Sequence, residues 1–202
     1  MIVISDNSAL SALAETGLLA LLPRLFGEVC IPEAVRSECG HPRAPQVLRE
    51  WISHPPDWLR IVPDPAERLL ETLGLGSGEA AAITLAWVNR KSSKLILDEK
   101  RGRRVAETLG LPMTGIVGII GEAAECKWLD FDETIASIRQ TGFHLSDSVV
   151  AVVRRKQTKA RTLTVEERPD FREPRLTSAL APRQAGSPSS DSTSVLSSCS
   201  RS

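Results

Sequence analysis

Short apolar runs alternate with helical segments over residues 1–153. The runs at 1–5, 28–31, 59–62 and 94–97 are rich in Val, Ile and Leu and have the length of strands. Strands that alternate with helices form a parallel sheet with helices on both of its faces. The sequence therefore predicts an α/β fold with a parallel sheet for this part of the chain.

The segments between these strands have the residue types and apolar spacing of helices. Pro23 is expected to end the first helix, and Pro32 suits the first turn of the second, because a helix needs no amide hydrogen there. A further short strand is expected within 110–115. We expect helices over residues 9–22, 32–38, 47–52, 79–89, 99–109, 116–126, 132–140 and 146–154.

The carboxy-terminal residues, 157–202, differ in composition. Nine of the residues from 186 to 202 are Ser, and Pro, Arg and Gly fill much of 168–188. Such a segment buries too little apolar surface to offset the entropy lost when it is ordered. We therefore expect one folded domain over 1–156 and a disordered tail over 157–202.

The net charge of zero conceals two halves of opposite sign. Residues 1–153 carry 15 Lys and Arg against 20 Asp and Glu, and residues 154–202 carry 10 against 5, so the net charges are −5 and +5. An acidic body argues against a protein that holds nucleic acid by charge alone. It does not argue against an enzyme whose acids are matched by bound cations.

Other features of the sequence bear on the compartment. No apolar run approaches the roughly 20 residues that cross a bilayer, and residues 1–10 lack the basic start and long apolar run of a secretory signal. The four cysteines form no C-x-x-C pair, which favours reduced thiols over disulfides or a zinc site. We expect a cytoplasmic protein with no membrane segment.

Four acidic residues are expected at one end of the predicted sheet. Asp6 and Asp98 each follow a strand, Glu79 opens a helix directly after Gly78, and Glu38 closes the helix after the second strand. In a parallel α/β sheet, ligands bind beyond the carboxyl ends of the strands. Carboxylates that converge there repel one another unless a cation intervenes, and their hard oxygens favour Mg²⁺ or Mn²⁺.

Each acid also has a simpler interpretation. Asp6 and Asp98 stand where helix N-caps stand, and Glu79 lies in a first helical turn, where the helix dipole favours an acid. Glu38 alone is typical of a solvated helix face. The order of the four residues and their shared end of the sheet favour the metal site.

The same order of acids carries a family resemblance. The chain contains the motifs IVISDNS, IPEAVRSE, LGLGSGEAAAITLA and LILDEKRGRRVAETLGLPMTG. Over residues 2–153 this series resembles the PIN-domain nucleases. It most resembles the branch related to VapC-type toxins, which includes a group known only as a domain of unknown function.

The resemblance implies a fold, an activity and a site. The fold would be a three-layer α/β/α sandwich with a parallel sheet. The activity would be Mg²⁺- or Mn²⁺-dependent hydrolysis of RNA phosphodiester bonds, as in a toxin–antitoxin ribonuclease. The metal-binding and catalytic residues of the family match Asp6, Glu38, Glu79 and Asp98, with Ser8 two positions after the first acid.

Further residues are candidates for contact with RNA. A basic group follows Asp98, and a threonine lies in a turn that resembles one near the family's site. Each has an alternative role as part of a solvated helix face or as a cap. Glu99 is either an auxiliary acid at the metal or a first-turn acid that the helix dipole stabilises. The substrate-binding candidates are Ser8, Arg101, Arg103, Arg104 and Thr114.

Other enzyme classes fit the sequence poorly. In G-x-G-x-x-G, the third glycine after Gly74 and Gly76 would fall at Glu79, so the dinucleotide-binding fingerprint is absent. Asp6 is followed by Asn7 and Ser8, which lacks the second acid of a D-x-D phosphatase motif. Two alternatives stay open: a PIN-like module that binds a protein with little activity, and a nuclease that acts on DNA. The resemblance also implies an antitoxin partner, and a homodimer is compatible with the apolar helices.

Overall fold

The computed structural model describes residues 1–140 and 142–166, with side chains described as far as Thr158. Every described residue belongs to one compact unit. None of the helices within these residues is both long and apolar enough to span a membrane. The expected disorder of the tail concerns mainly residues 167–202, which lie outside the described residues.

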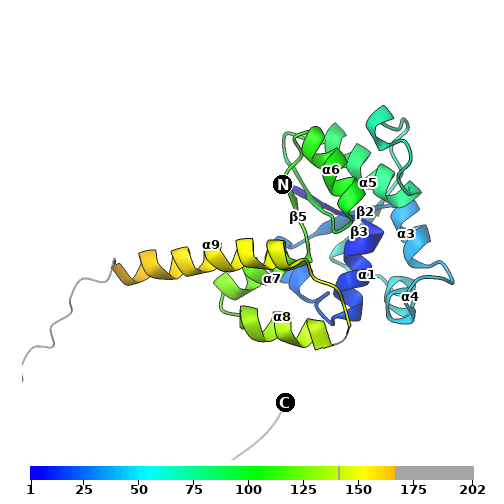
Figure 1. The fold of residues 1–202 in the computed structure, drawn as a ribbon. Helices are drawn as coiled ribbons and strands as arrows, with labels where there is room; N and C mark the ends of the chain where they lie inside the picture. Colours follow the sequence, from blue (N-terminus) through cyan, green and yellow to red (C-terminus); the bar gives the residue numbers. More distant parts are fainter. Residues whose placement is uncertain (141, 167–202) are drawn as a thin grey trace, which may run out of the picture. The chain divides into compact units, whose positions relative to one another are not determined.

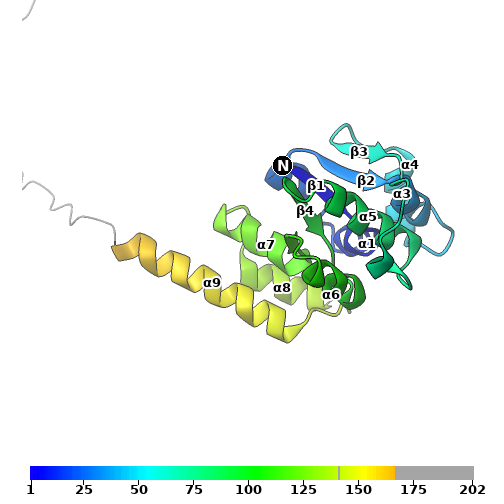
Figure 2. The same cartoon turned by 90° about the horizontal axis from the view of Figure 1, so that it is seen from above.

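A parallel sheet forms the centre of this unit. Its strands stand in the order β3-β2-β1-β4-β5, so β1 lies between β2 and β4. Figure 2 shows β3, β2, β1 and β4 side by side in this order. The strands are β1 (Ile2–Ser5), β2 (Val29–Pro32), β3 (Leu59–Val62), β4 (Ser93–Ile96) and β5 (Met113–Thr114).

Helices cover both faces of the sheet, as the alternating pattern predicts. Figure 1 shows α5 and α6 on one side of the strands and α1, α7 and α8 on the other, which makes three layers. The strand order reverses at β1, and right-handed crossovers place helices on opposite faces at such a reversal. The helices are α1 (Asn7–Glu15), α2 (Leu21–Phe26), α3 (Glu33–Cys39), α4 (Gln46–Ser53), α5 (Ser77–Val88), α6 (Lys100–Thr108), α7 (Ile116–Glu125), α8 (Phe131–Gln140) and α9 (Asp147–Glu166), with a 3-10 turn, η1 (Leu70–Thr72).

The core lies between the sheet and these helices. All four residues of β2 are buried, because helices cover the strand from both sides. On α5 every residue from Gly78 to Thr84 is buried, so this part of the helix is enclosed on every side. An enclosed α5 fixes its first turn against the ends of the strands, where the candidate site lies.

The amino-terminal helix differs from the expectation. The predicted helix over 9–22 is two helices, α1 and α2, because the chain turns at Gly17, which adopts a φ of 71°. Glycine adopts this left-handed conformation without steric cost and commonly ends helices. Pro23 lies inside the first turn of α2 instead of ending a helix, because first-turn amides have no partner to lose.

The carboxy-terminal helix is also longer than expected. α9 runs on to Glu166 instead of ending near Arg154, so residues 157–166 continue a helix. Contacts with α7 hold it there. Gln157 Nε2 donates to the Gly121 carbonyl at 2.8 Å, and a Cβ added to Gly121 would come within 2.6 Å of Val153.

Candidate metal centre

The carboxyl ends of β1 and β4 meet at the point where the strand order reverses. Their register pairs Ser5 with Ile96, and the Asp6 amide donates to the Ile96 carbonyl at 3.3 Å. Such a reversal leaves a crevice between the loops that leave the two strands. An acid pocket of about 90 Å³ lies here. It is lined by Asp6, Asn7, Ser8, Glu38, Gly76, Glu79 and Glu99.

Asp6 is the most enclosed acid of this pocket, with 2% of its surface exposed. Its Oδ1 accepts from the Ala9 amide at 2.9 Å and its Oδ2 from the Ser8 hydroxyl at 2.6 Å. Burial raises the pKa of Asp6 to about 7, although these two hydrogen bonds lower it, and Glu79 and Glu99 raise it further. Asp6 is therefore both the N-cap of α1 and a member of the acid pocket.

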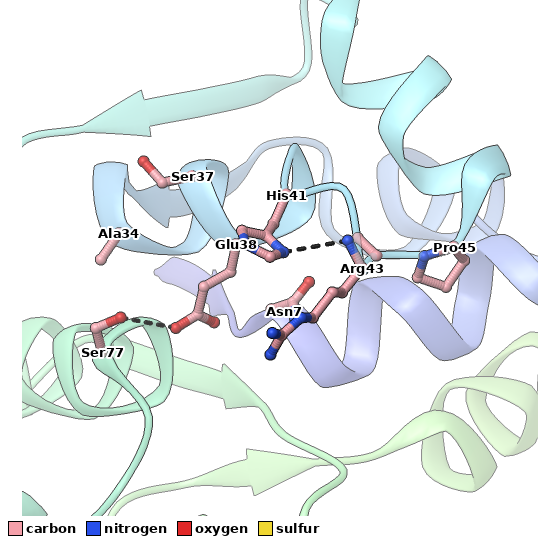
Figure 3. Close-up of a pocket in the computed structure, with 9 residues that line it drawn as sticks. Asn7, Ala34, Ser37, Glu38, His41, Arg43, Pro45 and Ser77 are labelled. Atoms are coloured by element: carbon pink, nitrogen blue, oxygen red, sulfur yellow. Dashed lines mark hydrogen bonds between the residues drawn. The ribbon is translucent and has the colours of Figure 1, made fainter.

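Glu38 connects α3 to the first turn of α5. Its Oε1 accepts from the Ser77 hydroxyl at 2.8 Å (Figure 3). The same oxygen accepts from the Gly78 amide at 2.7 Å. The carboxylate lies so close to the helix that a Cβ added to Gly78 would come within 2.4 Å of Oε2. Glycine at this position thus permits the approach of Glu38.

Glu79 is held with a polar atom unpaired. Its side chain is buried, with 7% of its surface exposed. Its Oε1 is buried and has no hydrogen-bond partner among the described residues. Burial raises the pKa of Glu79, and the neighbouring charge of Glu99 raises it further, although the Gly102 amide beside the carboxylate and the charge of Arg101 lower it. A Cβ on Gly102 would lie 2.0 Å from Oε1, so Glu79 packs directly on the backbone of α6.

Asp98 and Glu99 point to different places. Asp98 does not line the acid pocket; its Oδ1 accepts from the Ile116 amide at 3.3 Å, at the start of α7. Glu99, in extended conformation before α6, lines the pocket. The register pairs Ser5 with Ile96 at the ends of the two strands. Continued by one residue, it would place Asp6 level with Leu97, so that strand alternation would turn Leu97 and Glu99 to the side of Asp6 and Asp98 to the other.

The predicted substrate-binding residues are mostly committed to other contacts. Ser8 lines the acid pocket and donates to Asp6. Arg101 donates to the Gly74 carbonyl at 2.9 Å, and Arg103 donates to the Leu97 carbonyl at 2.8 Å. Both guanidinium groups therefore brace the backbone around the site.

Two candidates remain. Arg104 is exposed on α6. Thr114 is buried at the end of β5, so close to α7 that a Cβ on Gly118 would lie 2.2 Å from its hydroxyl oxygen. Neither residue lines the acid pocket.

The acid pocket offers the donors of a divalent-cation site, but not yet in the arrangement of a bound metal. Within residues 1–140 and 142–166, no three His, Cys, Asp or Glu side chains are arranged to hold a metal ion as they stand. The carboxylates of Asp6 and Glu38 instead accept hydrogen bonds from the protein. The chemistry nevertheless fits Mg²⁺ or Mn²⁺, because the donors are all carboxylates, Glu79 Oε1 is unpaired, and proximity and burial raise the pKa of two of the acids.

A neighbouring thiol does not join this set. Cys39 is buried, and its Sγ donates to Asn7 Oδ1 at 3.3 Å. Burial raises the pKa of Cys39 to about 12, with Glu38 and Asp6 adding to the rise. It stays a thiol at neutral pH, so it offers no thiolate to a metal.

A larger groove adjoins the acid pocket, and the sequence did not single it out. It has a volume of about 450 Å³ and shares Asn7 and Glu38 with the acid pocket (Figure 3). His41 and Arg43 line it. The available sequence signal was an arginine and a histidine in a Pro-rich loop directly after the helix that carries Glu38.

Comparison with known proteins agrees with the geometry. The family model of a PIN domain matches residues 2–159. No curated protein and no solved structure matches the chain. PIN domains are generally nucleases, and the chain belongs to the PIN-domain family.

Proposed function

We propose that this protein is a Mg²⁺- or Mn²⁺-dependent endoribonuclease that hydrolyses RNA phosphodiester bonds, of the kind found in toxin–antitoxin pairs. The observation that carries the proposal is the acid pocket at the carboxyl ends of β1 and β4, with the unpaired buried oxygen of Glu79. A protein that only needed stability would gain nothing from several carboxylates around one small cavity.

Asp6, Glu38, Glu79 and Glu99 would hold the cation. A bound divalent cation supplies a water of lowered pKa and neutralises charge on the phosphate. Ser8 fixes the rotamer of Asp6 through its hydrogen bond, and Gly102 sets the position of Glu79. In the hydrolysis the water oxygen bonds to phosphorus, the bond from phosphorus to the leaving ribose oxygen breaks, and a proton goes to that oxygen.

The identity of the fourth acid is a choice between Asp98 and Glu99. The family resemblance favours Asp98, and that assignment remains a prediction. The lining of the pocket favours Glu99. In our proposal Glu99 is the metal-side acid, and Asp98 holds the start of α7 through the Ile116 amide.

The choice of RNA, and of an antitoxin that covers the pocket, rests on the toxin-related resemblance. A DNA-directed nuclease and a PIN-like module that binds a protein are the alternatives. Matched RNA and DNA substrates separate the first alternative, because they differ in the 2′-hydroxyl. Failure of a folded protein to cleave either would favour the second.

The test uses the full-length chain on pools of RNA and of single-stranded DNA, with Mg²⁺, Mn²⁺ or EDTA. Two variants accompany it: Asp6→Asn, and Asp57→Asn, which changes an exposed acid outside the pocket. We expect RNA cleavage that needs the metal, is lost in Asp6→Asn and persists in Asp57→Asn. Cleavage by Asp6→Asn at the wild-type rate would contradict the proposal, as would a folded wild-type protein that cleaves with neither metal.

A further inference from the structure

The groove beside the acid pocket has a rigid wall. The loop between α3 and α4 makes a turn in which the Ala44 amide donates to the His41 carbonyl at 2.8 Å, with Pro42 and Arg43 at its centre. Proline at the second position of such a turn restricts its backbone. Arg49 Nη1 also donates to the Pro42 carbonyl at 2.6 Å, which ties the loop to α4.

His41 and Arg43 present hydrogen-bond donors at this wall. His41 Nδ1 accepts from the Arg43 amide at 3.1 Å, so the hydrogen of the neutral ring is on Nε2 (Figure 3). The guanidinium of Arg43 is exposed and makes no hydrogen bond or ion pair with any residue that the structure describes. Arg101 and Arg103, in contrast, bind backbone carbonyls.

The position of these donors next to the acid pocket suggests their ligand. Glu38 lines both cavities, but it accepts from Ser77 and Gly78 and forms no ion pair with Arg43 among the described residues. A strand whose scissile phosphate lies at the acid pocket must also pass carboxylates that repel its other phosphates. A free guanidinium on a rigid loop offsets that repulsion, and its planar donors match two phosphate oxygens.

We propose that this groove, lined by His41 and Arg43, is a subsite that binds a backbone phosphate of the substrate strand beside the scissile one. Arg43 donates to the phosphate oxygens from its guanidinium, and His41 from Nε2. The subsite deepens the proposed nuclease function and rests on it. Its ligand chemistry is a phosphodiester of a single-stranded nucleic acid.

The test measures strand binding by the full-length chain. Fluorescence anisotropy with a labelled single-stranded oligoribonucleotide is recorded over a range of salt concentrations in the Asp6→Asn background, where the strand stays intact. Arg43→Ala should raise Kd about tenfold and should lower the slope of log affinity against log salt by about 0.7, the value for one phosphate contact on a single strand. Arg43→Lys, which keeps the charge but not the planar donors, should lie between the two.

Arg36→Ala is the matched control. Arg36 is exposed on α3, close in sequence to Arg43, but it pairs with Glu33 and does not line the groove. The variant removes the same charge, so a general electrostatic effect would appear in both variants. We expect Arg36→Ala to leave Kd and the salt slope nearly unchanged.

A chemical probe locates the contact on the strand. Oligomers that carry one neutral methylphosphonate, moved position by position, should lose affinity for the parent protein at one position. The Arg43→Ala variant should be insensitive at that same position, because its contact is already absent. A loss at that position in both proteins would show that the contact is made elsewhere and would overturn the subsite.

The outcomes separate the subsite from the nuclease. If wild-type protein cleaves RNA with metal but Arg43→Ala keeps the parent affinity and salt slope, the subsite is wrong and the nuclease stands. In that case the groove is free for a protein partner. If no cleavage occurs but Arg43→Ala weakens binding at one phosphate, the groove still binds a phosphate of the strand, but the nuclease proposal fails. No strand binding at all would overturn the subsite.

Discussion

The carboxyl ends of β1 and β4 lie side by side, yet they supply acids in different ways. After β1, one residue, Asp6, is buried, caps a helix and lines the acid pocket. After β4, two acids stand in tandem: Asp98 turns to α7, and Glu99 turns to the pocket. An acid at a strand end is therefore a candidate ligand only if strand alternation faces it toward the crevice.

The largest expected difference is in catalysis by the two aspartates. Asp6→Asn should lower cleavage by about a hundredfold to a thousandfold, because a neutral amide replaces a buried ligand at the reacting centre. Asp98→Asn should cleave at close to the wild-type rate, since an amide oxygen still accepts from Ile116. The measurement is the initial rate of cleavage of one defined RNA, with thermal unfolding to show that both variants fold. Equal losses in the two variants would remove the distinction between the strand ends.

The second difference is the pH dependence of stability without metal. Folding raises the pKa of Asp6 from 3.8 to about 7, so between these values the folded state holds a proton that the unfolded state has released. The contribution of Asp6 to the free energy of unfolding is therefore fully present below pH 4. It is lost as the pH rises to about 7, by up to about 4 kcal/mol. Asp6→Asn should therefore be more stable than wild type above pH 7 in EDTA and similar to it at pH 4.

Denaturant unfolding at several pH values measures this difference. Glu79 should add to the trend, because burial raises its pKa too. Mg²⁺ at pH 8 should raise the stability of the wild type but not that of Asp6→Asn, because a ligand stabilises only the state that binds it. A stability difference between the two proteins that does not change with pH would contradict the account.

The third expectation concerns the glycine beneath Glu79. Gly102→Ala would place a methyl group 2.0 Å from Glu79 Oε1, and the carboxylate must move. Cleavage should fall by about tenfold to a hundredfold, as for other residues that orient metal ligands. Gly110→Ala is the control: no atom lies within 4 Å of its Cβ, but a φ of 65° makes the substitution strained. It should cost stability without costing cleavage, and a loss of cleavage in both would indicate general destabilisation.

The smallest expected effect on cleavage tests whether Glu99 or Asp98 is the fourth acid of the metal site. Glu99→Gln should lower cleavage about tenfold, less than Asp6→Asn, because Glu99 is exposed to water. Glu107→Gln removes the same charge from the exposed surface of α6 and should have no effect. Rates at saturating Mn²⁺ and at limiting Mn²⁺ show whether the loss arises from metal binding. Wild-type rates for Glu99→Gln at both concentrations would return the fourth position to Asp98.

The sequence patterns predicted the strands and the parallel sheet, because apolar runs and strand–helix alternation are local signals. They also predicted that Asp6, Glu38 and Glu79 lie at one end of the sheet, because only a few topologies are possible for such a sheet. The assignment of Asp98 rested on its place after a strand and on the family motif, and it stays a prediction. Whether Asp98 or Glu99 faces the acid pocket depends on strand alternation, and a shift of one residue reverses the face.

Other features depended on tertiary contacts that no pattern reports. The break between α1 and α2 at Gly17 interrupts a stretch that is apolar throughout. Arg101 and Arg103 look like solvated or RNA-facing residues until their backbone partners are known. The groove at His41 and Arg43 forms only when the loop after α3 folds beside the acid pocket.

Binding of Mn²⁺ to the full-length protein tests the central claim most directly. Titration of wild type, Asp6→Asn, Glu79→Gln and Asp98→Asn, followed by calorimetry, reports the site without requiring the right RNA. We expect the wild type to bind Mn²⁺, Asp6→Asn and Glu79→Gln to bind at least about tenfold more weakly, and Asp98→Asn to bind like the wild type. Equal binding by all four proteins, or a loss confined to Asp98→Asn, would contradict a metal centre in the acid pocket.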